Sequence, residues 1–221
     1  MFQQSSATES RPEFRWLNGS VPFAIGPGFD GADIQVILGA MEVYERESCV
    51  RFKQRLEGEE DWVLIRRGFG CGSSVGRQGG RQELILDHGC VFHRVVLHEL
   101  AHVVGLFHEQ SRPDRDQFVQ IFWENIRPDR LHNFAKYDSA YRRRLSNAPY
   151  DYASILHYHP KAFSRNGRQT LLPLVSGEFV GVAEELSNGD LYKVNALYAC
   201  PQTAYWASQI HLSAPPPRPI P

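Results

Sequence analysis

The chain has 221 residues, of which 42% are hydrophobic, and a formal net charge of −1. This length fits one large domain or two small lobes, and the apolar content is enough for a sizeable core. The near-neutral charge gives no indication of a nucleic-acid or membrane-surface partner, and no segment approaches the roughly 18 apolar residues of a membrane span.

The first part of the chain alternates short strands with one helix. Residues 1–12 are polar, lack the apolar run of a signal peptide, and are expected to be disordered or peripheral. A turn at Asn18–Gly19 leads into a strand. Apolar residues at three- and four-residue spacing predict a helix over residues 33–47. Further strands are predicted around residues 50–52, 62–65 and 83–87, with a glycine-rich loop over residues 68–80.

The segment H-E-L-A-H lies in a helix predicted over residues 91–105. His98 and His102 are four residues apart and therefore share one face of this helix, where both imidazoles can bind one Zn²⁺ at ~2.0–2.1 Å. Glu99 is rotated about 100° from His98, so it can reach a water on the metal without being a ligand.

A third histidine, His108, can join these two only if the helix ends before it. On a continuing helix His108 would lie about 240° around from His102 and point away. Gly105 can end the helix in the left-handed conformation and turn the chain back. The pattern H-E-x-x-H-x-x-G-x-x-H arises by chance in roughly one chain in 10⁴ of this composition. The alternative is an amphipathic core helix with solvated histidines. Three protein ligands with an open fourth position are typical of a catalytic zinc site.

The second half is predicted to be poor in regular structure. Residues 111–116 form a charged turn, residues 118–125 a short strand and turn, and long irregular stretches follow from 129 to 181. Ser187 and Asp190 form a capping box that opens a helix over residues 189–198. The final residues, 203–221, are predicted to be a proline-rich tail.

The four cysteines are dispersed and show no C-x-x-C spacing. An even, dispersed set favours two disulfides and an oxidising compartment, hence a secreted protein. The alternative is four buried free thiols in a cytosolic enzyme. The cysteines are Cys49, Cys71, Cys90 and Cys200.

The zinc motif, together with S-I-L-H-Y at residues 154–158, resembles the astacin family of metzincin zinc peptidases, in particular its tolloid and hatching-enzyme branches. The resemblance covers roughly residues 15–200. The other matching segments are R-W at 15–16, C-V-R-F at 49–52, G-C-x-S-x-V-G-R at 70–77, H-E-x-S-R-P-D-R-D at 108–116 and A-F-S-x-N-G at 162–167.

The resemblance implies an α+β catalytic domain over residues 13–202 with two lobes and a zinc ion on the floor of the cleft between them. The upper lobe, about residues 13–105, would hold a twisted, mainly β sheet and the zinc helix. The lower lobe, about residues 106–202, would be loop-rich with a C-terminal helix. The chain is expected to be a mature catalytic domain without the pro-segment, EGF or CUB modules of many relatives.

The resemblance also implies roles for individual residues. One zinc per chain would be bound by His98, His102 and His108, with Tyr158 as a further ligand that swings off when substrate binds. Glu99 would be the general base, and the Tyr158 hydroxyl would help to stabilise the oxyanion. The implied disulfides are Cys49–Cys200 and Cys71–Cys90.

Two further features are implied for the surroundings of the zinc. Glu109 matches a family glutamate that contacts the mature N-terminus; the alternative is a solvated loop carboxylate. The strand at residues 83–87 resembles the edge strand along which the family binds an extended peptide. Lys161, Arg165 and Arg168 are candidates for a subsite that binds acidic substrate residues.

Leu156 departs from the family, which has methionine at this position of the turn beneath the zinc. Methionine there is not a ligand but an apolar base under the histidines, and leucine is close to it in volume. Such swaps usually cost less than ~1.5 kcal/mol. We therefore expect the departure to leave the site chemistry intact.

The sequence as a whole predicts a secreted zinc endopeptidase that cleaves protein or peptide substrates. One alternative is a catalytically silent astacin-like module that binds extracellular partners, although the intact Glu99 argues against it. Another is a zinc hydrolase acting on a substrate other than a peptide.

Overall fold

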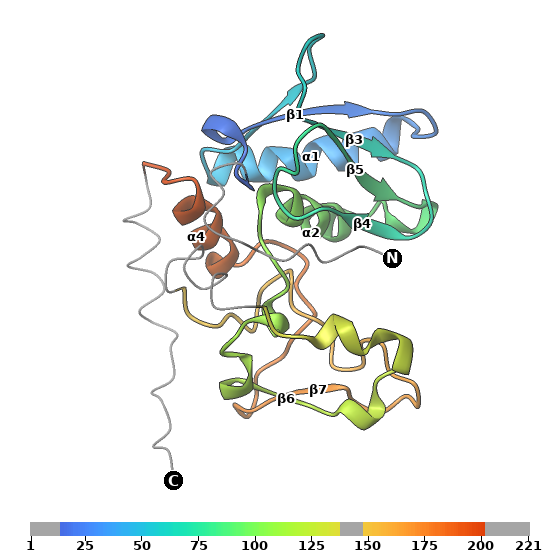
Figure 1. Cartoon of the computed structure of the whole chain (residues 1–221), viewed down its shortest axis with the longest axis vertical. Coiled ribbons are helices and arrows are strands. Elements are labelled where there is room, and N and C mark those ends of the chain that lie inside the picture. The colour runs from blue at the N-terminus through green and yellow to red at the C-terminus, as the bar shows by residue number, and fades with distance from the viewer. Residues whose placement is uncertain (1–13, 138–147, 202–221) are drawn as a thin grey trace.

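The computed structural model describes residues 14–137 and 148–201, which form two parts stacked along the long axis of the molecule (Figure 1). The upper part holds the larger sheet and helices α1 (Gly31–Glu47) and α2 (His93–Val104). The lower part consists mainly of loops and short turns. Helix α4 (Asn188–Leu197) lies beside the junction of the two parts.

The sheet of the upper part has the strand order β2-β1-β3-β5-β4. Its members are β1 (Ser20–Ile25), β2 (Arg51–Gln54), β3 (Trp62–Arg66), β4 (Cys71–Ser73) and β5 (Arg81–Leu86). All neighbouring pairs are parallel except β4 and β5, which are antiparallel. The α+β fold class is therefore confirmed, and strands are found at all four predicted places.

The edge strand is not the one that the sequence indicated. The predicted strand at residues 83–87 corresponds to β5, which pairs with β3 on one side and with β4 on the other. The edge is β4, three residues within the predicted glycine-rich loop. Such a short strand has too few residues for alternation of apolar and polar side chains to be visible, so periodicity could not identify it.

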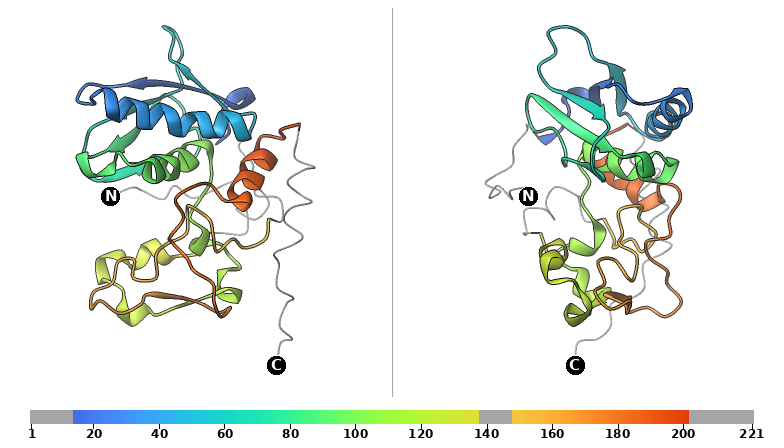
Figure 2. Two further views of the ribbon diagram at one scale, coloured as in Figure 1. Left: turned by 180° about the vertical axis from the view of Figure 1, so that it is seen from behind. Right: turned by 90° about the vertical axis from the view of Figure 1, so that its right-hand side faces the viewer.

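Helices α1 and α2 cover the same side of this sheet (Figure 2). Helix α1 begins two residues earlier than predicted because Asp30 caps it, in a capping box with Asp33. Its buried Tyr44 donates its hydroxyl proton to the carbonyl oxygen of Leu97 in α2, over 2.7 Å. This bond satisfies the polar end of a fully buried aromatic side chain and ties the two helices together.

The lower part is held by a two-stranded antiparallel sheet and a small apolar cluster of its own. Strand β6 (Val119–Ile121) falls where a short strand was predicted, and it pairs with β7 (Leu171–Pro173). Strand β7 lies within the stretch predicted to be irregular. The cluster is built around the buried residues Val119, Tyr150, Leu171 and Val180.

Helix α4 is tied to the upper part by covalent and polar contacts. Its N-terminus has the predicted capping box of Ser187 and Asp190. Disulfides join Cys49 to Cys200, just after α4, and Cys71 to Cys90; these are the two pairs that the family resemblance implies. Among the described residues, no helix combines the length and apolarity needed to cross a membrane.

Candidate metal centre

The glycine turn at the end of α2 brings the predicted histidines together. Gly105 adopts φ 112°, a conformation that favours glycine, and its N–H donates to the carbonyl of His102 over 2.8 Å. The next amide, of Leu106, donates to the carbonyl of Ala101 over 2.9 Å. These bonds close the helix, and the chain then turns back toward the face that carries His98 and His102.

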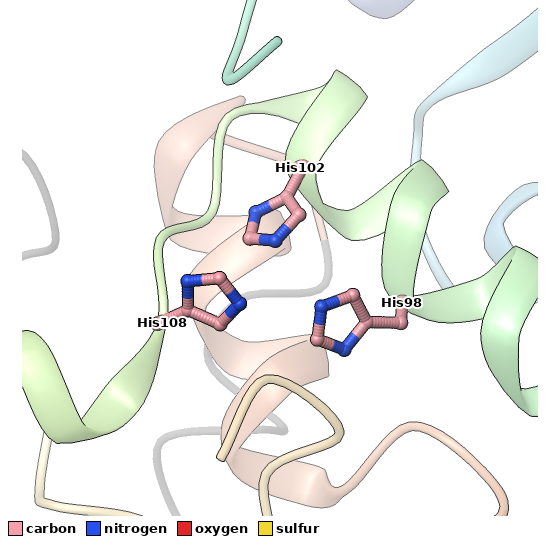
Figure 3. A group of neighbouring side chains, drawn as sticks. All are labelled: His98, His102 and His108. Carbon is pink, nitrogen blue, oxygen red and sulfur yellow. The ribbon is translucent and has the colours of Figure 1, made fainter. Parts of the chain in front are cut away.

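His108 reaches this face from the loop beyond the turn. The candidate ligand atoms of His98, His102 and His108 all lie within 4.8 Å of one another. Figure 3 shows the three rings around a common centre, two from the helix and one from the loop. Nitrogen atoms bound to one zinc ion at about 2 Å lie at most about 4 Å apart, so small movements of the rings would bring these atoms onto one ion.

Hydrogen bonds orient two of the three imidazoles. Nδ1 of His98 lies 2.8 Å from the carbonyl oxygen of Ile155, and Nδ1 of His102 lies 2.8 Å from that of Leu106. A carbonyl oxygen only accepts, so each Nδ1 carries the proton and each Nε2 is left with a lone pair. Burial lowers the pKa of all three histidines, which favours the neutral form that binds metal. The donor set therefore fits a zinc ion.

Glu99 lies in the same helix but on a different face from the two ligands. It is 5% exposed, and its Oε2 has no hydrogen-bond partner among the described residues. Burial raises the pKa of Glu99 to about 7. A buried carboxylate oxygen without a partner is costly, so this atom is available to a water or ligand at the site.

Tyr158 lies beside the third histidine. The centres of its ring and of the His108 ring are 4.7 Å apart, in an edge-to-face arrangement. Burial raises the pKa of Tyr158, so the hydroxyl is protonated at neutral pH. Two residues earlier, Leu156 is 1% exposed and belongs to the main apolar core, as expected for the apolar turn beneath the site.

Glu109, directly after His108, is buried and surrounded by hydrogen-bond donors. Its Oε1 accepts from Nη1 of Arg112 over 3.0 Å and from the backbone N–H of Asp151 over 2.9 Å. Its Oε2 accepts from Nζ of Lys193 in α4 over 2.7 Å. Burial opposes ionisation, but the charges of Lys193 and Arg112 outweigh it and hold the pKa of Glu109 below its ordinary value. The solvated-carboxylate alternative is therefore wrong. The contact of Glu109 with a mature N-terminus stays a prediction, because residues 1–13 lie outside the described part of the chain.

Asp190 of α4 organises the turn that holds His98. Its carboxylate accepts from the hydroxyl of Ser154 over 2.6 Å and from the N–H of Ile155 over 2.8 Å. The carbonyl of Ile155 is the group that contacts Nδ1 of His98. Sequence reasoning assigned Asp190 only to the capping box and did not identify Lys193 at all. The contacts of Asp190 with Ser154 and of Lys193 with Glu109 each join groups more than 30 residues apart in the chain.

The edge strand β4 lies beside the metal-binding helix. The Ser73 hydroxyl donates to the carbonyl of Glu99 over 2.8 Å, which fixes the end of the strand against α2. One edge of β4 is paired with β5, and its other edge has no partner strand among the described residues. Backbone groups on that edge are therefore candidates for binding an extended chain.

Within the described part of the chain, the other histidines and the charged turn lie outside the three-histidine cluster. His157 is buried and makes hydrogen bonds to the Tyr150 hydroxyl and the Tyr158 carbonyl, a structural role as predicted. The charged turn forms ion pairs, among them Arg112 with Asp114. Four further histidines are exposed or partly exposed: His88, His93, His132 and His159.

Comparison with known proteins agrees with this geometry. The sequence model of the peptidase family described as Astacin matches residues 8–199. Zinc metalloproteinase nas-6 of Caenorhabditis elegans is 43% identical over 190 residues, which are 85% of this chain and 55% of that protein. Zinc metalloproteinase nas-7 of the same organism is 41% identical over 192 residues, 87% of this chain and 50% of that protein. The chain thus spans about half the length of these relatives.

Solved structures give the same result at the level of the fold. High choriolytic enzyme 1, a hatching enzyme zinc-protease from Oryzias latipes, superposes with a TM-score of 0.81 at 37% identity, covering 88% of this chain and 100% of that one. Myroilysin superposes with a TM-score of 0.58 at 22% identity, covering 85% of this chain and 96% of that one, which supports the fold alone.

Proposed function

The chain belongs to the astacin family of peptidases, and from this premise we propose that it is a zinc-dependent endopeptidase. Zinc is the cofactor of this family of proteinases. The observation that carries the proposal is the convergence of three neutral imidazoles beside a buried carboxylate with an unpartnered oxygen.

We assign the metal to His98, His102 and His108. When bound, zinc acts as a Lewis acid toward a carbonyl oxygen and lowers the pKa of a water toward ~7. The three histidines leave room for a substrate or a water because three protein ligands do not fill a tetrahedral site. The hydrogen bonds of His98 and His102 to the carbonyls of Ile155 and Leu106 keep these two rings from turning away.

Glu99 is the proposed general base. Its carboxylate takes a proton from the water that attacks the peptide carbonyl, and then delivers that proton to the leaving amine. Its position in α2 next to His98 supports this role, because the side chain emerges beside the ligands without being one. Its free Oε2 supports it further, since no other described group occupies the atom that would hold the proton.

Tyr158 is the proposed second catalytic group. Its ring lies against that of His108, which places the side chain beside the proposed metal site. A protonated hydroxyl at this place can donate to the oxyanion that develops on the substrate carbonyl. Its role as an additional metal ligand in the absence of substrate belongs to the same proposal.

The substrate is proposed to be an extended segment of protein or peptide that pairs with β4. The edge of β4 and the helix that bears Glu99 lie side by side, linked through Ser73. A substrate strand added to β4 would therefore form backbone hydrogen bonds with the edge of β4 and would pass the proposed metal site. The two disulfides support a secreted, extracellular location for this activity.

The test is cleavage of a reduced, unfolded protein by the purified chain, with its zinc content measured on the same sample. We expect about one zinc per chain, cleavage that stops when a chelator removes the zinc, and recovery when zinc is returned. A chain that holds zinc and cuts none of several unfolded proteins would instead favour a silent binding module. A chain that holds no zinc would overturn the proposal.

A further inference from the structure

A buried lysine is linked by an ion pair to the residue that follows the third metal ligand. Lys193 is 2% exposed, although lysine is among the residues least often buried. Its Nζ lies 2.7 Å from Oε2 of Glu109, and these two residues are 84 positions apart in the chain. Glu109 itself follows His108 directly. Burying an unpaired ammonium costs free energy of desolvation, so a buried lysine requires a partner of opposite charge.

The ion pair acts on the backbone that carries His108. Glu109 donates its own N–H to the carbonyl of Leu156 over 3.2 Å, so its main chain is fastened to the turn beneath the site. Its side chain is fastened on the other side by Lys193. With both ends held, the residue beside His108 has little freedom to shift, and the direction of the His108 imidazole is set accordingly.

The second cation near Glu109 cannot replace Lys193. Arg112 gives one bond to Glu109, but its Nε and Nη2 both donate to Asp114, each over 2.9 Å. Two other carboxylates lie near Lys193: that of Asp190, at 3.9 Å, beyond hydrogen-bond distance, and that of Asp151, whose charge also raises the pKa of Lys193. Within residues 14–137 and 148–201, Lys193 is therefore the cation bonded to Oε2 of Glu109, and its removal leaves that oxygen without a charged donor from this part of the chain.

Helix α4 supplies a rigid base for this contact. The Cys49–Cys200 disulfide follows the helix, and the side-chain amide of Asn195 donates to the carbonyl of Glu47 at the end of α1 over 3.0 Å. The Lys193 ammonium is thus held by the upper part of the molecule while it contacts the loop of His108. We propose that Lys193 is a positioning residue for the metal centre, acting through Glu109 on His108; this inference rests on the proposed zinc site.

The experiment compares Lys193→Met with Lys193→Arg and with Asn195→Ala, a control that loosens α4 without touching Glu109. Each protein is loaded with Co²⁺ to record the visible spectrum of the metal site, and the rate of zinc loss to a chelator is measured beside thermal unfolding. We expect Lys193→Met to shift the cobalt bands and to lose zinc about 10–100-fold faster than the parent, if the 10–100-fold loss of metal affinity that follows removal of a group behind a ligand is expressed in the release rate. Lys193→Arg should restore much of the parent behaviour.

The control separates positioning from general stability. Asn195→Ala should lower the unfolding temperature and leave the cobalt spectrum and the zinc release rate close to those of the parent. If Lys193→Met behaves in the same way, the proposal is overturned while the zinc site stands. If the parent binds neither metal, the proposed function itself fails. Should Lys193→Met not fold, the double variant Glu109→Gln/Lys193→Met, which removes both charges, takes its place, and the same two readouts decide.

Discussion

Leu156 stands where the family has methionine, and its surroundings explain why the exchange is tolerated. The side chain is 1% exposed within the main apolar core, and the backbone of this residue holds the turn together. Its N–H bonds to the Ser154 hydroxyl oxygen over 3.1 Å, and its carbonyl accepts from the N–H of Glu109. These bonds do not depend on the identity of the side chain.

Leu156→Met is accordingly expected to change kcat/KM by less than about tenfold, or ~1.4 kcal/mol. The reason is that leucine and methionine have similar volumes and neither is a ligand. The measurement is steady-state cleavage by parent and variant at equal zinc content. A much larger gain for methionine would mean that leucine strains the histidines, contrary to the packing argument.

Among single residues, the sequence predicted which three histidines the fold brings together, but not the groups behind them. His98, His102 and Glu99 are neighbours on one helix, and Gly105 explains the approach of His108, so local spacing was sufficient. Lys193 contacts Glu109 only because two distant segments fold together. No local pattern carries such a contact, and it became visible only from the structure.

At the scale of single elements, the turn at Gly105 determines whether the site forms. Its φ of 112° is one that other residues rarely adopt. A β-carbon there would lie 3.0 Å from Cδ2 of Leu197 and 3.2 Å from Cε1 of Phe14, which is tighter than ordinary packing. Backbone strain and crowding therefore both disfavour any residue with a β-carbon at position 105.

Gly105→Ala is expected to destabilise the protein by about 1–3 kcal/mol and to weaken zinc binding. The same exchange at Gly39 is the matched control, because Gly39 lies inside α1 and a β-carbon there meets no atom within 4 Å. Gly39→Ala should stabilise by about 0.5–1 kcal/mol. Denaturant unfolding measures the change in the free energy of unfolding for each variant, and the two changes should have opposite signs. Similar changes in both variants would contradict the role assigned to the φ of Gly105.

Strand predictions succeeded for the longer strands and for β6, which has only three residues. The four longer strands of the upper sheet were found from apolar runs, whereas β4 and β7 are three residues each and are defined by their partners. Because β4 was missed, the sequence analysis assigned the edge strand beside the proposed metal site to the segment that forms β5. Pairing across a sheet depends on residues far apart in the chain. The pairing of β5 with both β3 and β4 in the structure shows that β5 is not the edge strand.

For the whole molecule, the two disulfides differ in how much chain they close. Cys49–Cys200 spans 151 positions and Cys71–Cys90 spans 19. The longer closure ties α4, and with it Asp190 and Lys193, to the upper part. The family resemblance implied this pairing; the cysteine spacing alone left three possibilities open.

Replacing Cys49 and Cys200 by serine is expected to lower the free energy of unfolding by about 5 kcal/mol, and replacing Cys71 and Cys90 by about 3 kcal/mol, in the chain-entropy model. Peptide mapping under non-reducing conditions should first find these two pairs in the parent. Denaturant unfolding then compares the two double variants. Other pairings would contradict the assigned disulfides, and four free thiols would in addition remove the basis for an extracellular location.

The central claim is that Glu99 moves the proton in a zinc-dependent cleavage, and Glu99→Gln tests it most directly. Glutamine has nearly the same shape, so the fold, the three imidazoles and the zinc content should be retained. The proton transfer should be lost, and since Glu99 would serve in both attack and amine protonation, we expect a decrease of about 10⁴-fold or more in kcat.

The decisive measurement is therefore cleavage of one unfolded protein by parent and Glu99→Gln, with zinc determined on the same samples. We expect equal zinc content in the two proteins, an active parent, and a kcat of the variant that is lower by about four orders of magnitude. An active parent and an equally active, zinc-loaded variant would contradict it, because another group would then have to carry the proton.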